Sequence, residues 1–286
     1  MTWTTTAPPY LCTNCGFWQR SFCPPPWCPI CIDPRHAPPR DGWVFWSVED
    51  ARARLRTEIV EVEPGLWRAV TTPPVGIGGS GYLVQTDAGT TAFEACAWYD
   101  DAALATIAAL GGLRWVAASH PHTYGALWQL QERFGCEVSV GVDDLGWTGA
   151  FTVTWPLDDR LRLEPGLTLH LTAGHFPGHA VLHEERRRVL FCGDALKLDL
   201  GTDGRTAHAI STHKGFLRRI PLSLAEVRRY RDVFAPLDFT QTWTPFEQGA
   251  NADRAAALHL LDTLLATRPS LDHMPLPGRP LDEEDR

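Results

Sequence analysis

The sequence predicts an α/β fold that carries a small four-cysteine metal module at its N-terminal end. Apolar runs typical of strands alternate with helical stretches from about residue 81 onward, an order typical of layered α/β proteins. Five of the eight cysteines lie in the first 31 residues, and four of them form two CxxC pairs. With 286 residues, the chain is long enough for one large domain or two ordinary ones.

Composition narrows the classes of function. A net charge of -8 argues against binding to a nucleic-acid backbone. No apolar run approaches 18 residues, so we expect no membrane span, and the first residues lack the pattern of a signal peptide. We therefore expect a cytoplasmic protein whose cysteines serve as thiols or metal ligands rather than disulfides. Twelve tryptophans indicate a large aromatic core or a hydrophobic pocket.

Residues 1–40 are predicted to form the metal module. Cys12 and Cys15 make one CxxC pair, Cys28 and Cys31 the other, with twelve residues between them. Two such turns can direct four thiolates at one ion, and nine prolines leave little regular structure to stabilise the segment otherwise. The module resembles zinc ribbons and also rubredoxin-like domains, so zinc and iron both fit. A closed four-thiolate site has no open position, which indicates a structural role, and Cys23 is interpreted as a spare cysteine.

A linker with a short helix over Val48–Arg56 is expected across residues 41–58, and the large domain over residues 59–268. Two strands, 81–86 and 90–95, flank a turn at 87–89 and predict a hairpin. A helix over 102–110, with Asp100 or Asp101 as its N-cap, follows them. Residues 269–286 are predicted to be a flexible tail.

Two histidines follow the next predicted strand, Trp115–Ala118. Alternate side chains of an extended segment point to the same side, so His120 and His122 can bind one ion. On their own they would more often be ordinary loop histidines. A helix over Tyr124–Phe134 is expected after them, which places both histidines in a strand-to-helix loop.

Further polar side chains end later predicted strands. His175 and His179 lie in the loop after a strand at 167–172, and Asp194 follows a hairpin at 180–192. Two helices are expected near the end of the chain, over 222–234 with Ser223 as its N-cap and over 255–266 with Asn251 as its N-cap.

Three motifs in order resemble the metallo-β-lactamase superfamily: HPH at 120–122, GHFPGH at 174–179 and CGD at 192–194. The resemblance covers roughly residues 60–250 and implies a four-layer αβ/βα sandwich. It also implies that His120, His122 and His175 bind one zinc ion, that Asp194 is a bridging carboxylate, and that His179 supports the site by hydrogen bonding.

The sequence departs from the family where a second metal ion is usually bound. Tyr124 and Gly125 stand at the places of the family's second-site aspartate and histidine, and the stretch 239–246 lacks the expected last histidine. We therefore predict a single active-site ion. His208 and His213 remain open as substitute ligands.

These observations predict a metal-dependent, zinc-containing hydrolase of a small-molecule substrate. Asp194 is the expected general base, and Tyr124 an expected hydrogen-bond donor to a developing oxyanion. The esters, lactones, thioesters and phosphoesters that such a site can cleave are all kept as candidates. Iron remains possible at either site. No nucleic-acid or membrane partner is expected, and the sequence does not indicate an oligomeric state.

Two alternatives to the hydrolase remain. A degenerate family member could bind a ligand or a partner without catalysis, because second-site ligands are missing. A redox protein related to the flavodiiron family is less consistent with the sequence, because that family has a glutamate where His122 stands and carries a flavodoxin-sized domain.

Overall fold

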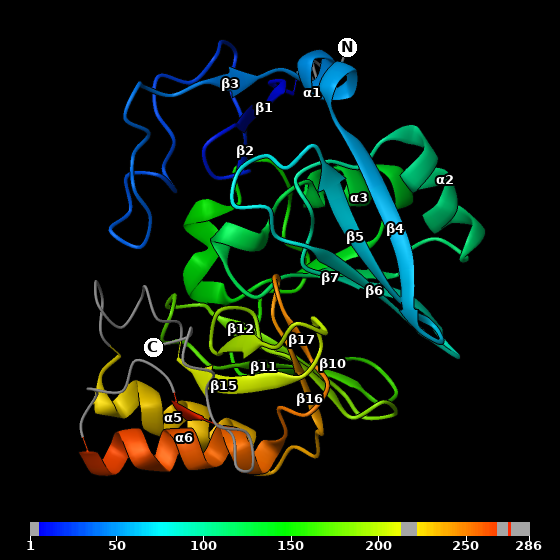
Figure 1. Ribbon diagram of the computed structural model, residues 1–286. Helices are drawn as coiled ribbons and strands as arrows, with labels where there is room; N and C mark the ends of the chain where they lie inside the picture. The colour runs from blue at the N-terminus through cyan, green and yellow to red at the C-terminus, as the bar shows by residue number, and fades with distance from the viewer. Residues whose placement is uncertain (1–5, 213–221, 268–273, 276–286) are drawn as a thin grey trace. The chain divides into compact units, whose positions relative to one another are not determined.

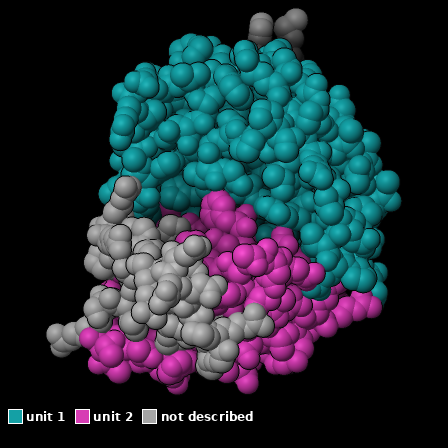
Figure 2. Space-filling view, in the orientation of Figure 1, with its two compact units in different colours: residues 1–140, 144–156 teal, residues 141–143, 157–286 magenta. Residues whose placement is uncertain are grey.

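The computed structural model describes residues 6–212, 222–267 and 274–275. The chain divides into two compact units, Met1–Val140 with Asp144–Pro156 and Gly141–Asp143 with Leu157–Arg286 (Figure 2). Unit 1 includes the first 40 residues together with the early part of the predicted large domain. The predicted domain limits remain predictions, and His213 lies outside the described residues.

Two strands of the N-terminal module and one strand of the predicted linker form a three-stranded antiparallel sheet in unit 1, in the order β2-β1-β3. Its strands are β1 (Pro9–Cys12), β2 (Trp18–Arg20) and β3 (Phe45–Trp46), and helix α1 (Val48–Arg54) follows. Ser47 and Asp50 form a capping box at the start of α1. The predicted helix is therefore confirmed, but it ends at Arg54 because Arg56 begins the next strand.

The large sheet of unit 1 runs β4-β5-β6-β7-β8-β9, in chain order; Figure 1 labels β4 to β7 of this sheet. Its first four strands form an antiparallel meander, and β7, β8 and β9 are parallel. Helices cross over between the parallel strands, as such connections require. The bounds are β4 (Arg56–Glu63), β5 (Leu66–Thr72), β6 (Gly81–Thr86), β7 (Gly89–Phe93), α2 (Asp101–Ala109), β8 (Trp115–Ala117), α3 (Leu127–Phe134) and β9 (Glu137–Ser139).

The predicted hairpin is confirmed as β6–β7, and the predicted helix at 102–110 is confirmed as α2. The Asp100 side chain accepts a hydrogen bond from the Ala103 N–H and is the N-cap. The helix predicted from Tyr124 begins only at Leu127, because Pro121–Thr123 form a 3₁₀ turn (η1). The segment that contains both histidines is thus more tightly turned than predicted.

Tryptophans form part of the unit 1 core. Trp18 of the module is 1% exposed, and its ring stacks on Trp98 at 5.9 Å and meets Trp128 edge-on at 5.2 Å. Its indole N–H donates a 2.8 Å hydrogen bond to the Ala97 carbonyl. The module is therefore packed into the core of unit 1, and the expectation of a large aromatic core is confirmed there.

Unit 2 contains a six-stranded sheet in the order β10-β11-β12-β13-β16-β17. All neighbouring strands are antiparallel except β13 and β16. The predicted hairpin at 180–192 is confirmed as β12–β13. The bounds are η2 (Val142–Trp147, across the junction of the units), β10 (Arg160–Glu164), β11 (Leu167–Leu171), β12 (Ala180–Glu184), β13 (Val189–Phe191), β16 (Gln241–Trp243) and β17 (Gln248–Gly249).

Helices α5 (Leu224–Phe234) and α6 (Arg254–Thr267) pack against each other in unit 2 (Figure 1). A small sheet of β14 (Lys197–Leu200), β15 (Ala207–Ser211) and β18 (Met274–Pro275) lies beside α6, which contacts β15. Ser223 caps α5 as predicted. The prediction that Asn251 caps α6 is wrong: Asp253 accepts from the Ala256 N–H, and the Asn251 amide instead pairs with both backbone groups of Ala207. None of the helices in the described part of the chain is long and apolar enough to cross a membrane.

Replacing Trp18 by alanine should lower the free energy of unfolding by about 3–5 kcal/mol, because a large buried ring and its hydrogen bond are lost. Chemical denaturation measures this change. Trp27→Ala is the matched control in the same module: its side chain is 48% exposed, so the expected change is within about 0.5 kcal/mol. Equal effects of the two substitutions would contradict the packing of the module into the unit 1 core.

Candidate metal centres

The four predicted cysteines come together in unit 1. The Sγ atoms of Cys12 and Cys31 are 3.6 Å apart, as are those of Cys15 and Cys28. Thiolates on a tetrahedral zinc ion lie roughly 3.8 Å apart, given a Zn–S bond of about 2.3 Å, whereas a disulfide bond is about 2.05 Å long. The four side chains are at most 2% exposed. Their spacing and chemistry fit a four-thiolate metal ion.

Hydrogen bonds connect the four thiols and favour the ionisation of Cys31, whereas the same contacts and burial raise the pKa values of Cys15 and Cys28. Contacts with Cys12, Cys15 and Cys28 lower the pKa of the Cys31 thiol far below its usual range, and the Asn14 amide, 3.3 Å away, donates to the same sulfur. A lowered pKa favours the thiolate that binds metal. Cys23 is exposed and is not part of the cluster.

The β5–β6 loop lies against the first CxxC turn. The Gly76 N–H donates to the Thr13 carbonyl at 3.1 Å, and an added Cβ on Gly76 would lie 2.3 Å from the Gly16 nitrogen. Backbone is thus packed directly on backbone at this contact. The same part of unit 1 contains a small hollow that Cys15 and Gly16 line together with His122.

A second candidate set of metal ligands begins at the carboxyl ends of β7 and β8 in unit 1. His120 is fully buried and His122 half-buried, and their ring centroids are 5.3 Å apart at an interplanar angle of 73°. Parallel strands end at one edge of a sheet, so Glu94 after β7 lies beside Ser119 after β8. The two imidazoles are therefore held next to each other, as the HxH pattern predicts.

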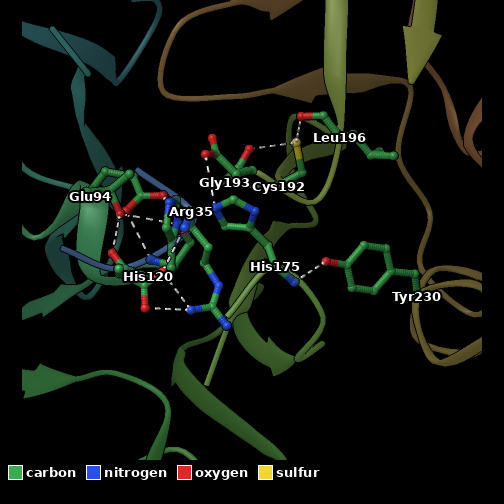
Figure 3. A network of polar contacts seen from close by, with 12 residues as sticks. Arg35, Glu94, His120, His175, Cys192, Gly193, Leu196 and Tyr230 are labelled. Atoms are coloured by element: carbon green, nitrogen blue, oxygen red, sulfur yellow. Dashed lines mark hydrogen bonds and ion pairs between the residues drawn. The ribbon is translucent and has the colours of Figure 1, made fainter. Parts of the chain in front are cut away.

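A buried polar chain orients His120 (Figure 3). Glu94 accepts from the Ser119 N–H at 3.0 Å and from the Ser119 hydroxyl, and Ser119 Oγ lies 2.7 Å from His120 Nδ1. With Glu94 ionised, the Ser119 hydroxyl donates to the carboxylate and the His120 Nδ1–H donates to Ser119. This tautomer leaves His120 Nε2 as the lone-pair donor for a metal ion. Burial raises the pKa of Glu94 to about 7, although the charge of His120 and the Ser119 hydrogen bonds oppose the rise.

The two residues that replace the family's second-metal ligands are enclosed in unit 1. The Tyr124 side chain is 1% exposed and packs edge-on against Phe151, and burial raises its pKa well above the usual value. Gly125 has φ +39°, and an added Cβ would lie 2.2 Å from the Ala95 carbonyl oxygen. A histidine at position 125 would therefore require the backbone to move.

His175 lies in unit 2, in the loop between β11 and β12. Its backbone N–H donates to the Tyr230 hydroxyl of α5 at 3.0 Å (Figure 3). The predicted supporting residue His179 is fully buried and closes the same loop: the Thr172 hydroxyl is 2.7 Å from His179 Nδ1, and the His179 carbonyl accepts from the Thr172 N–H. The loop is thus fixed at both ends and in its middle.

Asp194 follows β13 in unit 2 and is 6% exposed. Its Oδ2 lies 3.3 Å from His175 Nε2. A carboxylate and an imidazole nitrogen at this separation are suitable ligands for one ion, because Zn–N and Zn–O bonds are each about 2.0–2.2 Å long. His208 lies on β15 with its ring against Gly201, and it does not group with His175 and Asp194 among the residues described.

Three residues that contact the candidate ligands or their loops were not predicted from the sequence. Ser119 could have been suspected from the sequence, because it adjoins the HxH motif. Its hydrogen bond to Glu94, however, depends on the pairing of two strands that are distant in the sequence. Tyr230 is separated from His175 by 55 residues and appears in the sequence only as one aromatic of a helix. His36 lies against His122 in unit 1, with ring centroids 5.5 Å apart, and nothing in its local sequence indicates this.

Comparisons with known proteins agree with these motifs. The model of the metallo-beta-lactamase superfamily matches residues 75–266, about two thirds of the chain. This chain belongs to the metallo-beta-lactamase superfamily. The predicted family, the α/β fold of that family and the N-terminal four-cysteine cluster are thereby confirmed.

Relatives of this superfamily member are distant. It is 28% identical over 282 residues to the Bacillus subtilis protein YmaE, covering 93% of this chain and 99% of that protein. A metallo-beta-lactamase from Hirschia baltica has a similar fold, with TM-score 0.53, 18% identity and coverage of 76% of this chain and all of that one. The mono-zinc form of FIM-1 from Pseudomonas aeruginosa has TM-score 0.52 at 16% identity, over 76% of this chain and 98% of its own.

Gly125→Ala should lower the free energy of unfolding by about 2–5 kcal/mol, because it adds a clash with the Ala95 carbonyl to the cost of a left-handed backbone. Gly135→Ala is the control: its φ is +62°, but an added Cβ would meet nothing within 4 Å. We expect a loss of about 1–2 kcal/mol there. Chemical denaturation of both variants measures the difference, and equal losses would show that position 125 has room for a side chain.

Tyr230→Phe should lower the free energy of unfolding by about 1–3 kcal/mol, because the buried N–H of His175 loses its acceptor. Tyr124→Phe is the matched control, since that hydroxyl is buried without a hydrogen-bond partner among the described residues. Its removal should leave stability unchanged or raise it. Thermal and chemical unfolding compare the two variants, and a neutral Tyr230→Phe would remove Tyr230 from the support of the His175 loop.

Proposed function

We propose that this protein is a metal-dependent hydrolase with one zinc ion held by His120, His122 and His175, with the carboxylate of Asp194 beside the ion and its bound water. The observation that carries the proposal is that each unit holds two of these side chains, His120 and His122 in unit 1, and His175 and Asp194 in unit 2. Each of these two pairs is called a half-site. Each half-site has two side chains that can bind zinc at the ends of sheet strands, and buried hydrogen bonds fix His120 in one and the backbone of His175 in the other. Their order along the chain is the order of the family's motifs, and the family model covers both.

The donor set favours a single ion. Three neutral imidazoles match the protein ligands that zinc takes in hydrolytic sites, and they would leave the fourth position for water beside the Asp194 carboxylate. The close contact at Gly125 supports this count, because the family's second-site histidine does not fit there. A solved relative in the superfamily, FIM-1, is described in a mono-zinc form.

The protein's own side chains would orient the reactants and transfer the proton. Bound zinc would supply Lewis acidity and lower the pKa of a water molecule to about 7. In this proposal Asp194 accepts the proton of the attacking water, because its carboxylate adjoins the His175 nitrogen. Glu94 and Ser119 hold His120 in the tautomer that binds metal. The role of Tyr124 as a hydrogen-bond donor to an oxyanion stays a prediction: its hydroxyl is enclosed and its ring packs on Phe151.

The substrate that we propose is a small molecule with an ester, lactone, thioester or phosphoester bond. The acidic net charge disfavours nucleic acids. We propose a cytoplasmic location, supported by eight cysteines that form no disulfide among the described residues and by a four-thiol cluster that oxidation would destroy. The ion in the four-cysteine cluster is proposed to be structural, and zinc and iron both fit its chemistry.

His120→Ala and His175→Ala should each lower the metal content by about one ion per chain, from two to one. Activity on any substrate found among the four bond classes should fall by about 100-fold or more, because the ion that activates water is lost. Elemental analysis and kcat/KM measure the two effects. His259→Ala, on the exposed side of α6, is the control and should change neither. Full activity in His120→Ala would contradict the proposal.

A non-catalytic ligand-binding protein is the second candidate. Tyr124 and Gly125, which replace two metal ligands of the family, are the observation that favours it. This candidate gains support if the purified protein holds metal only in the four-cysteine cluster and hydrolyses none of the four bond classes.

A further inference from the structure

The first CxxC turn supports the β5–β6 loop through backbone contacts. The Gly16 N–H donates to the Cys12 carbonyl at 2.9 Å and closes the turn. The Gly76 N–H of the loop donates to the Thr13 carbonyl at 3.1 Å, and the next N–H along the loop donates to the Cys15 carbonyl at 3.5 Å. An added Cβ on Gly76 would lie 2.3 Å from the Gly16 nitrogen. The position of the loop therefore depends on the turn that supplies two of the four thiols.

The same turn and loop adjoin the loop that carries the two histidines. The hollow beside Cys15 is lined by residues 75 and 77–80 of the β5–β6 loop, by Ala95 and by His122. The Ala95 N–H donates in turn to the Thr123 carbonyl at 3.0 Å. The first CxxC turn, the β5–β6 loop and the histidine loop thus surround one small space within unit 1.

The second CxxC pair is connected to His122 by another route. The Asn14 side-chain amide donates both to the Cys31 sulfur, at 3.3 Å, and to the Ala37 carbonyl, at 3.0 Å. Ala37 directly follows His36, whose ring meets the His122 ring edge-on with centroids 5.5 Å apart. A change in the position of the Cys31 sulfur would therefore be transmitted to the ring that packs on His122.

These contacts exist only while the two CxxC turns are formed. Residues 1–40 contain nine prolines, and the described part of this segment has two short strands, β1 and β2. Few backbone hydrogen bonds would keep the turns in place without an ion. In metal modules of this kind the bound ion supplies much of the folding free energy. Filling the cluster therefore favours the state in which the β5–β6 loop and the His36 ring are held against the surroundings of His122.

We propose that the four-cysteine cluster positions His122, so that an ion in the cluster raises the affinity of the active site for its own ion. The inference rests on the proposed metal centre and assigns it a form of regulation. A metal ligand that must be ordered on binding costs conformational entropy, and a first ion that has already ordered it removes this cost. Coupling between two sites typically changes affinity by about 5–150-fold. A chain whose cluster is empty would accordingly hold its active-site ion weakly.

The competing explanation is a cluster that stabilises its own module and nothing else. The full chain reconstituted with Co²⁺ separates the two explanations, because Co²⁺ replaces zinc and reports its ligands by absorption. The thiolate charge-transfer band follows the cluster. The part of the visible spectrum that His120→Ala removes belongs to the active site, and its titration gives the affinity of that site.

Gly76→Ala tests the contact between the loop and the turn while it keeps all four cysteines. Gly78→Ala is the matched control: the two residues have φ +67° and +73°, but an added Cβ on Gly78 would meet nothing within 4 Å. We expect Gly76→Ala to keep the thiolate band and to weaken Co²⁺ binding at the active site at least about 5-fold. Gly78→Ala should bind as the wild-type protein does. If Gly76→Ala also loses the thiolate band, the substitutions at His36 decide.

His36→Ala and His36→Phe test the second route. Alanine removes the ring that packs on His122, whereas phenylalanine keeps a ring that can pack edge-on. We expect His36→Ala to weaken active-site binding of Co²⁺ at least about 5-fold and His36→Phe to restore most of it, with the thiolate band present in both. Wild-type affinity in both Gly76→Ala and His36→Ala would overturn the inference.

Amide hydrogen exchange in His120→Ala tests the inference apart from the proposed function, because that active site lacks a ligand. One equivalent of Co²⁺ should slow exchange at Gly76 and Ala126 at least about 10-fold and leave β12 of unit 2 unchanged. Unchanged exchange at both residues, or equal slowing in β12, would overturn the coupling.

The two proposals fail in different ways. If wild-type protein binds a second Co²⁺ whose affinity the Gly76 and His36 substitutions leave unchanged, the metal centre stands and the coupling is overturned. If wild-type protein binds Co²⁺ only through its thiolates, the proposed metal centre fails and the coupling fails with it.

Discussion

The backbone after β7 is hydrogen-bonded along its length to the backbone after β8, and the unit 1 half-site depends on this contact. Glu94 N–H donates to the Ala117 carbonyl, Ala95 N–H to Thr123 and Ala126 N–H to Cys96. These bonds lie at or just beyond the ends of two parallel strands. The backbone N–H and C=O groups there would otherwise lack a partner in the sheet. They hold the histidine loop against residues 94–96. The contact positions His120 and His122, and it also leaves no room for a side chain at position 125.

The motifs whose geometry depends only on neighbouring residues could be predicted from the sequence. Two CxxC pairs fix four sulfurs within short turns, and HxH fixes two rings on one side of a chain, so neither needs long-range information. The supports of these groups could not be predicted in the same way. Glu94 reaches Ser119 only because β7 pairs with β8, and Tyr230 reaches His175 only because α5 packs beside the β11–β12 loop. The prediction that Asn251 caps α6 was wrong for a similar reason. Its side-chain amide forms hydrogen bonds with the backbone of β15, which is far away in the sequence.

The N-terminal module packs into the core of unit 1. Trp18 lies among core aromatics, Gly76 packs on the first CxxC turn, and His36 lies beside His122. Burying Trp18 contributes several kcal/mol, which is a large share of the stability of a typical domain. If the four-cysteine cluster holds a metal ion, as proposed, loss of that ion would disturb unit 1 as a whole, and with it the loop that carries the two histidines.

Burial also explains why the polar groups of unit 1 form a chain rather than isolated contacts. Glu94 lies in a site that raises its pKa to about 7, so its charge is costly there unless hydrogen bonds and a cation compensate it. The Ser119 hydrogen bonds supply part of that compensation, and a divalent ion on the far nitrogen of His120 would supply more. The carboxylate, the hydroxyl, the imidazole and the ion would then stabilise one another, since each favours the charge or tautomer that the next one needs. The buried carboxylate behind His120 therefore supports the proposed metal ion on the other nitrogen of this ring.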